Sequence, residues 1–279
     1  MYWYPEKTRA RRTATIVASV CYLIAVVFLI LVEIGSVRGT KILGDIYFFK
    51  LNTANVLAQS TPSTLTLQNS IAQTLGLHDF YQAGLWSFCE GYLDEGITDC
   101  SKPSSHFWFN PVEILLNELF AGASIALPSE VNEILTILRL VSHIMFGFFL
   151  TGLLLNAALV ILSPIAVYSR WLSLPFGLLS FLSALVVIVA AGLGTAIAYV
   201  FKYALSSQPD LGVDADVGVK MLAFGWIAAG FTLLAFTIHA GLGCCGTSRR
   251  DIRKGWKKRT EKTNSATLGA ESPHDAKNE

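Results

Sequence analysis

Two cysteines are the residues of this chain whose types and spacing most directly suggest chemistry. Cys89 and Cys100 lie close together in the stretch GLWSFCEGYLDEGITDC, among acids, glycines and aromatics. Such a pair forms a disulfide in an oxidising compartment, or remains as free or zinc-bound thiols. Zinc requires four ligands at finger-like spacing, which His78 and His106 are poorly placed to supply. A redox role is disfavoured because the chain has no C-x-x-C pair. We therefore expect a structural disulfide.

No pattern typical of an enzyme accompanies these cysteines. The chain has no cofactor-binding motif, no paired carboxylates suited to acid–base catalysis and no nucleophile beside a base. We therefore expect no enzymatic activity, no cofactor and no bound metal. A small membrane transporter or an enzyme is the least favoured of the functions considered.

The composition indicates a membrane protein. Hydrophobic residues make up 53% of the 279 residues and charged residues only 15%, against about a quarter charged in soluble domains. Four apolar runs reach the roughly 20 residues that a helix needs to cross a bilayer core. These runs are 14–34, 140–162, 177–201 and 221–242. The predicted fold is an all-α membrane protein, a bundle of four transmembrane helices. The first run is longer than the apolar part of a signal peptide, so we expect it to be retained.

Basic residues near the ends of the runs predict the orientation. The segments 1–13 and 243–279 are basic, and Arg170 lies in the short link 163–176. The link 202–220 instead contains the acidic stretch LSSQPDLGVDADVGV, which has no basic residue. We therefore expect both termini in the cytoplasm, and the long segment 35–139 and the acidic link outside. This outer position places Cys89 and Cys100 in an oxidising compartment.

The outer segment carries signals of a small β-containing fold around the cysteines. Asp94-Glu95-Gly96 predicts a turn between two short strands, Phe88–Tyr92 and Ile97–Cys100. A disulfide would close this hairpin and stabilise it by roughly 2–3 kcal/mol. We expect Trp86 to pack on the small sheet that the bridge closes.

Further signals lie on either side of this hairpin. Residues 45–51 are rich in aromatic and β-branched types and predict a strand. Asn110-Pro111-Val112-Glu113 predicts a helix start, and Ser129-Glu130 predicts that the second span begins as a helix above the membrane. The Ser/Thr/Gln-rich run 58–70 predicts a flexible loop.

The tail predicts contact with membrane lipid. Its basic residues recur at offsets of one, three and four and fill half of a helix, although Gly255 weakens the helix premise. Basic residues beside a cytoplasmic leaflet attract anionic lipids such as phosphoinositides. The alternative is that these charges only fix the topology; nucleic-acid binding is not expected of a tethered segment. The candidate lipid-binding residues are Arg249, Arg250, Arg253, Lys254, Trp256, Lys257, Lys258 and Arg259.

Two further patterns concern the membrane spans. Cys244 and Cys245 lie at the inner boundary and are candidates for S-palmitoylation, although cysteines at such positions are often unmodified. Ala190-x-x-x-Gly194 and Gly225-x-x-x-Ala229 allow close helix approach, either within the bundle or between copies in a homo-oligomer.

Polar residues inside the spans are expected to pack within the bundle or lie at an interface. They are Asn156, His143 and His239, with Glu33 at the outer end of the first run. A proton relay would need a chain of carboxylates. A histidine-based response to pH remains open because histidine titrates near neutrality.

The outer segment and the order of the spans resemble a known family. Gly84-Leu85-Trp86 followed by Cys89 and Cys100, in a long first outer segment of a four-span chain, is similar to the claudin-like superfamily. Three blocks resemble the fungal Sur/PalI family more closely: DIYFFKLNTANV, LGLHDFYQAGLWSFCEGY with TDCSKPSSHFWFNPVEIL, and LGVKMLAFGWIAAG. Tetraspanins are excluded because their large loop lies between spans three and four.

The resemblance implies a location and a role. It implies a fungal plasma membrane, static furrow-like domains called eisosomes, and links to cell-wall organisation and endocytosis. We therefore expect a non-enzymatic organiser of cortical membrane domains, with eisosome proteins or further copies of the chain as partners. The alternative is a PalI-like accessory component of ambient-pH sensing, which the short tail makes less favoured.

Overall fold

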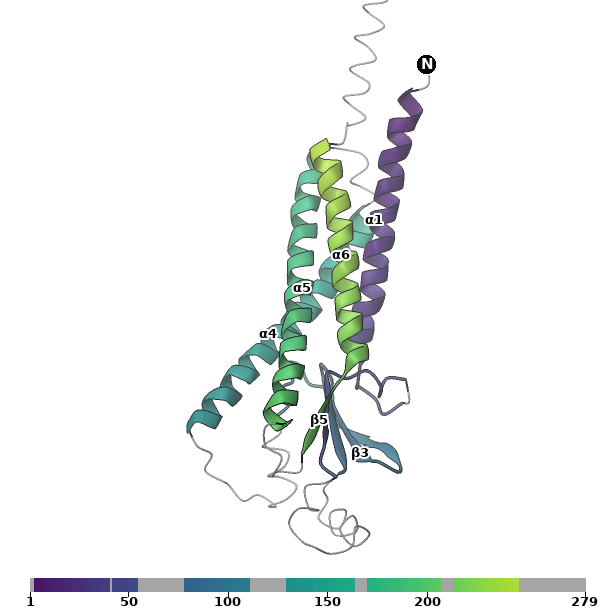
Figure 1. Cartoon of the computed structure of the whole chain (residues 1–279). Coiled ribbons are helices and arrows are strands. Elements are labelled where there is room, and N and C mark those ends of the chain that lie inside the picture. Colours follow the sequence, from purple (N-terminus) through teal and green to yellow (C-terminus); the bar gives the residue numbers. More distant parts are fainter. Residues whose placement is uncertain are drawn as a thin grey trace, which may run out of the picture.

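The computed structural model describes residues 3–40, 42–54, 78–110, 129–163, 170–206 and 213–245. In these ranges the chain forms four long helices with a small sheet at one end of them (Figure 1). The helices are α1 (Trp3–Ile34), α4 (Ser129–Leu162), α5 (Arg170–Ser206) and α6 (Val219–Cys245).

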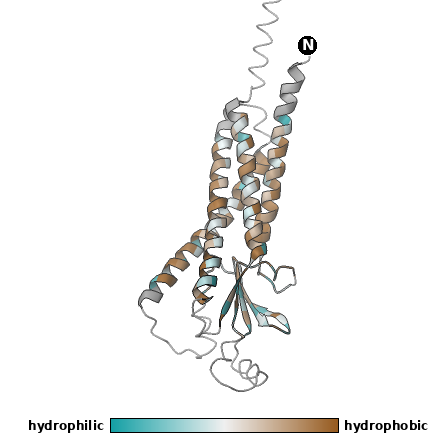
Figure 2. Ribbon diagram, viewed as in Figure 1, coloured by the Kyte–Doolittle hydropathy of each residue, from teal (hydrophilic) through white to brown (hydrophobic). Residues whose placement is uncertain are grey.

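Each of these helices contains a stretch that is long and apolar enough to cross a membrane. The stretches are Arg12–Ile34, Glu133–Leu162, Pro175–Ser206 and Val219–Leu242. Figure 2 shows hydrophobic residues along the helices and a mixed distribution in the sheet. The chain is therefore a multi-pass membrane protein, and the predicted four-helix fold is confirmed.

The bundle has two distinct ends. Helix α1 begins and helix α6 ends at one end, which we call the terminal end, and the sheet lies at the other, the sheet end (Figure 1). Helix α4 begins at Ser129, the predicted helix start, and this end of the helix lies at the sheet end (Figure 1).

The sheet has five antiparallel strands in the order β4-β3-β2-β1-β5. The strands are β1 (Phe49–Asn52), β2 (Phe80–Ala83), β3 (Phe88–Tyr92), β4 (Gly96–Cys100) and β5 (Asp214–Val217). The hairpin of β3 and β4 is the one that the sequence predicts. We did not predict β2 or β5. Strand β5 comes from the acidic link between α5 and α6, so both links on this side of the bundle build one sheet.

Strand β1 is shorter than the predicted strand 45–51. It begins at Phe49 because the residues before it form a turn, in which the amide of Ile46 donates to the carbonyl of Leu43 at 3.2 Å. The hydroxyl of Ser36 donates to the carbonyl of Ile46 at 2.9 Å. The expected helix after Asn110 and the expected loop at 58–70 lie outside the described residues.

The sheet and the bundle share one hydrophobic core. At about 1.5 Å per residue, the 37 residues of α5 extend about 55 Å, well beyond a hydrocarbon core of about 30 Å. The last turns of α5 therefore continue beside the sheet, where Phe201 stacks on Phe49 with ring centroids 4.3 Å apart. Phe109, from the segment after β4, contacts both rings edge-on.

Small residues on the helices allow this packing. A Cβ atom on Gly194 would lie 2.8 Å from the ring of Phe48, so glycine admits the aromatic residue that precedes β1. A Cβ on Gly225 would make ordinary contacts with Ala191 and Phe149. These residues therefore serve packing within the chain, and self-association stays a prediction.

Asn156 links three helices inside the bundle. Its amide nitrogen donates to the carbonyl of Gly152 at 2.8 Å and to the hydroxyl of Ser183 on α5 at 3.0 Å. Its oxygen accepts from the hydroxyl of Thr232 on α6 at 3.1 Å. The side chain is fully buried, which agrees with the expected packing role.

Candidate functional site: the junction of the sheet with helix α1

The disulfide lies at the centre of the junction. Cys89 and Cys100 stand directly opposite each other in β3 and β4 and are joined by a disulfide, as predicted. Cys89 is completely buried. The turn that follows α1 covers this face of the sheet: a Cβ on Gly39 would lie 3.0 Å from Ile97 of β4, and one on Gly44 would lie 2.3 Å from it.

The end of helix α1 has a strained backbone that exposes its polar groups to the sheet. Ser36 has a positive φ of 54°, which is uncommon for a residue other than glycine. Its amide donates to the carbonyl of Leu43 at 3.1 Å, and its carbonyl accepts from the hydroxyl of Ser87 at 2.7 Å. Gln82 of β2 donates to the carbonyl of Gly44 at 2.7 Å. The side chains of Gln82 and Ser87 thus supply hydrogen-bond donors to the backbone carbonyls of this turn.

The motif Gly84-Leu85-Trp86 joins the sheet to the bundle. A Cβ on Gly84 would lie 2.6 Å from the carbonyl oxygen of Gly35, so a larger residue would push the sheet away from the end of α1. The amide of Gly84 donates to the carbonyl of Ser87 at 2.9 Å, which closes a tight turn. Leu85 is 1% exposed and belongs to the shared core.

Trp86 makes contacts with the helices that the sequence analysis did not predict. Its indole Nε1 donates to the Glu33 carboxylate (Oε2) of α1 at 2.7 Å. Its ring meets Phe146 of α4 edge-on, with centroids 4.6 Å apart. His106 packs on the same Phe146 at 5.3 Å and on His143 at 5.6 Å. Trp86 therefore holds the motif turn, α1 and α4 together.

The sequence analysis located Glu33 at the outer end of the first apolar run but did not predict its hydrogen bond with Trp86. It is 7% exposed, and its second oxygen, Oε1, has no hydrogen-bond partner among the described residues. Two features of the sequence could have predicted this bond. One is an acidic residue at the end of an apolar run, and the other is a tryptophan in the motif, whose N–H needs a hydrogen-bond acceptor when it is buried.

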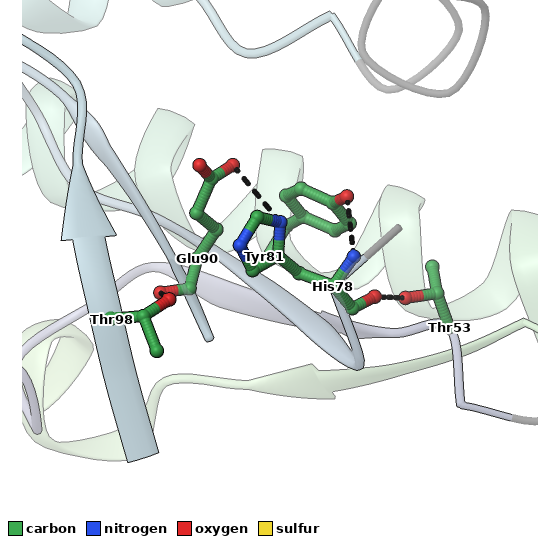
Figure 3. A network of polar contacts seen from close by, with 5 residues as sticks. All are labelled: Thr53, His78, Tyr81, Glu90 and Thr98. Carbon is green, nitrogen blue, oxygen red and sulfur yellow. Dashed lines mark hydrogen bonds and ion pairs between the residues drawn. The ribbon is translucent and has the colours of Figure 1, made fainter. Parts of the chain in front are cut away.

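A second cluster lies around His78, which precedes β2 (Figure 3). The ring of His78 stacks on Tyr92 at 4.8 Å and lies edge-on to Tyr81 at 6.0 Å. Its Nδ1 is 3.8 Å from the Glu90 carboxylate (Oε2) of β3. The hydroxyl of Thr53, just after β1, donates to the carbonyl of His78 at 2.6 Å. The cluster therefore joins β1, β2 and β3 at the same end of the three strands.

Charged groups of β1 and β5 meet beside the junction. Lys50 lies over the ring of Phe80, with its Nζ 3.6 Å from the centroid. Burial lowers the pKa of Lys50, and the nearby Asp216 and Asp45 act in the opposite direction. Asp45 also pairs with Lys220 at 2.7 Å. That pair is exposed, so its contribution to stability is small.

The structure leaves the other candidate residues untested. Cys244 and Cys245 end helix α6, but the surroundings of their side chains are not described. The basic residues from Arg249 to Arg259 lie outside the described residues. Palmitoylation and lipid binding therefore stay predictions. In the described ranges no three His, Cys, Asp or Glu residues are grouped as metal ligands would be.

Comparison with known proteins extends the resemblance over most of the chain. Residues 14–238 match the SUR7/PalI family. "SUR7 family protein pun1" of Schizosaccharomyces pombe is 23% identical over 265 residues, which cover 80% of this chain and 91% of that protein. "Protein PUN1" of Saccharomyces cerevisiae is 26% identical over 239 residues, which cover 79% of this chain and 88% of that protein.

Removing the disulfide should lower the stability of the sheet. We expect Cys89→Ser, Cys100→Ser and the double variant to lose about the same amount, roughly 2–3 kcal/mol, because each breaks the same cross-link. Thermal unfolding of the purified protein and the amount delivered to the cell surface are the measurements. Variants as stable as the wild type, or a double variant with twice the loss, would contradict this account.

Replacing Trp86 tests the bond to Glu33. Trp86→Phe keeps an aromatic edge for Phe146 but leaves both Glu33 oxygens without a donor, so we expect a loss of about 1–3 kcal/mol. Glu33→Gln should lose less, because its amide oxygen still accepts from Trp86.

The matched control is the double variant Trp86→Phe, Glu33→Leu. Removing both polar partners should restore much of the stability that Trp86→Phe loses. The thermal midpoints of the wild type, Trp86→Phe, Glu33→Leu and the double variant give the coupling between the two positions. Additive losses in the double variant would show that the bond does not hold the junction.

Proposed function

Because the chain belongs to the SUR7/PalI family, we propose that it is a non-enzymatic protein of the fungal plasma membrane that organises cortical domains of the eisosome type. The same proposal links it to cell-wall organisation and endocytosis. The observation that carries it is the family match, which spans nearly all of the four helices and the whole described sheet.

The geometry of the junction supports a structural role. The polar side chains there are engaged in holding the turn after α1: Ser36, Gln82 and Ser87 all make hydrogen bonds to it or from it. The disulfide is buried under the same turn. These groups brace a fold and are not arranged around a reacting molecule.

We propose that the sheet end faces the cell wall and the terminal end faces the cytoplasm. A structural disulfide at the sheet end is typical of an oxidising compartment, and the basic tail follows α6 at the terminal end. Tyr199, Tyr203 and Trp226 are exposed on α5 and α6 towards the sheet end, which suits an aromatic belt at the outer interface.

The cytoplasmic end would supply the contacts with lipid and protein. In this proposal the basic residues after Cys245 bind anionic lipid, phosphoinositides included. Palmitoylation of Cys244 and Cys245 would add a second membrane signal. Other eisosome proteins or further copies of the chain would complete the domain.

Live imaging of a tagged chain tests the proposal. We expect immobile cortical patches at the plasma membrane that recover slowly after photobleaching. A uniform plasma-membrane signal would contradict the organising role. A variant lacking the disulfide, Cys100→Ser, is the control for misfolding, because retention in the endoplasmic reticulum should then appear only in that variant.

A second candidate function is an accessory role in ambient-pH sensing, which the cluster around His78 favours. The titratable groups that face His78 are Glu90 and Tyr92 of β3 and Tyr81 of β2. Histidine gains its charge between about pH 5 and pH 8. A positive charge on His78 would be attracted to the carboxylate of Glu90, whose Oε2 lies 3.8 Å from Nδ1, and to the face of Tyr92.

Growth of a gene-deletion strain at alkaline pH distinguishes the accessory role in pH sensing from the organising role. The accessory role predicts that the deletion abolishes growth at alkaline pH, and that His78→Phe, which keeps the aromatic stack but cannot take up a proton, also impairs it. Normal alkaline growth of the deletion strain would remove this candidate and leave the organising role unaffected.

A further inference from the structure

The imidazole of His239 is a buried polar group that the proposed function does not use. His239 lies on α6 and is 1% exposed. Neither ring nitrogen has a hydrogen-bond partner in the part of the chain that the structure describes. More than nine in ten buried polar groups in proteins are hydrogen-bonded to protein or to water, and an unmet one costs free energy. Two unmet nitrogens on one ring therefore need an explanation.

The neighbours of His239 make this part of the bundle polar. Its ring stacks on Tyr22 of α1, with centroids 5.8 Å apart and planes at 20°. The Tyr22 hydroxyl is hydrogen-bonded to Ser180 of α5. One turn before Tyr22, Ser19 is hydrogen-bonded to Ser163, which follows α4. All of these except Ser19 are fully or nearly fully buried. Two pairs of hydroxyl groups therefore lie in this region: Tyr22–Ser180, beside the ring of His239, and Ser19–Ser163, one helical turn nearer the terminal end.

The rest of the interior differs sharply from this region. Towards the sheet end, α4 and α5 meet the sheet through Phe146, Phe149 and Phe201, in a core of aliphatic and aromatic residues. Near His239 the apolar cluster is small and includes the alanines Ala18 and Ala235. Ala235 lies one turn before His239 on the same face of α6. Among the described residues, this cluster has five buried members, against twenty-three in the cluster that includes the sheet end.

The depth of His239 in the membrane favours contact with water. His239 lies three residues before Leu242, the last residue of the apolar stretch of α6, so a helical rise of about 1.5 Å per residue places it about 5 Å from the terminal end of that stretch. The ring therefore lies near the edge of the hydrocarbon on the terminal side. Water has only a short way to travel from that side, past the hydroxyl groups of Ser19 and Ser163.

We propose that His239 forms a water-binding site inside the terminal end of the bundle. One or more water molecules that enter from the terminal side hydrogen-bond to the ring nitrogens of His239, in the polar region that Tyr22, Ser180, Ser19 and Ser163 provide. The bundle then has a hydrated terminal half and a dry sheet half. This site is independent of the proposed organising role.

Radiolytic hydroxyl labelling of the full chain in lipid nanodiscs, read by mass spectrometry, tests the site directly. Hydroxyl radicals form only where water is present, so they label a buried side chain only when water lies beside it. Tyr22 and Tyr81 are matched controls for each other, because both are tyrosines with at most 1% exposure. We expect Tyr22 to be labelled severalfold faster than Tyr81. Equal labelling would overturn the proposal.

The variant His239→Phe gives a second and independent measurement. Phenylalanine keeps a planar ring against Tyr22 but offers no nitrogen to water. If the site is hydrated, the thermal midpoint should fall by a few degrees, because water beside the ring loses its partner, and Tyr22 labelling should drop to the level of Tyr81. If the site is dry, the midpoint should rise instead, because the variant removes two unmet polar atoms. That rise would contradict the proposal.

Discussion

The hydrogen bond from Trp86 to Glu33 joins the turn between β2 and β3 to helix α1. This turn carries the motif Gly84-Leu85-Trp86. Without it the carboxylate of Glu33 would be buried with neither oxygen paired, a costly state in a low-dielectric setting. Gly84 makes the bond reachable, because its missing side chain lets the turn approach the carbonyl of Gly35. This contact ties the sheet to the end of α1, and the shared hydrophobic core ties it to the other helices.

The sheet then transmits that position to the remaining helices. Strand β1 pairs with β2 on one side and with β5 on the other, and β5 is followed almost at once by α6. The end of α5 reaches the same sheet through Phe201. The sheet therefore combines strands from the link between α1 and α4 with one strand from the link between α5 and α6. The disulfide joins the two strands of its β3–β4 hairpin. A sheet built this way fixes the spacing of the helix ends that it joins.

The interior of the bundle changes character along its length. Phenylalanine rings fill the end under the sheet, whereas Asn156, Tyr22, Ser180 and His239 occupy the middle and the terminal end. Hydrogen bonds between membrane helices are individually modest, about 0.6 kcal/mol on average, and close packing of side chains adds to them. The polar region includes the end of the bundle at which α6 ends (Figure 1).

The sequence by itself determined the four spanning helices, the hairpin of β3 and β4, the disulfide and the family. Each of these rests on local information: apolar runs of bilayer length, a turn between short strands, and a motif with two cysteines on one side of the membrane. Only the tertiary structure decided the rest. Strand β5 has a weak local pattern and exists because β1 offers it an edge. The partners of Trp86, Gln82 and His239 depend on residues far away in the chain. Such contacts follow from how the helices and the sheet are placed in space, which no local pattern specifies.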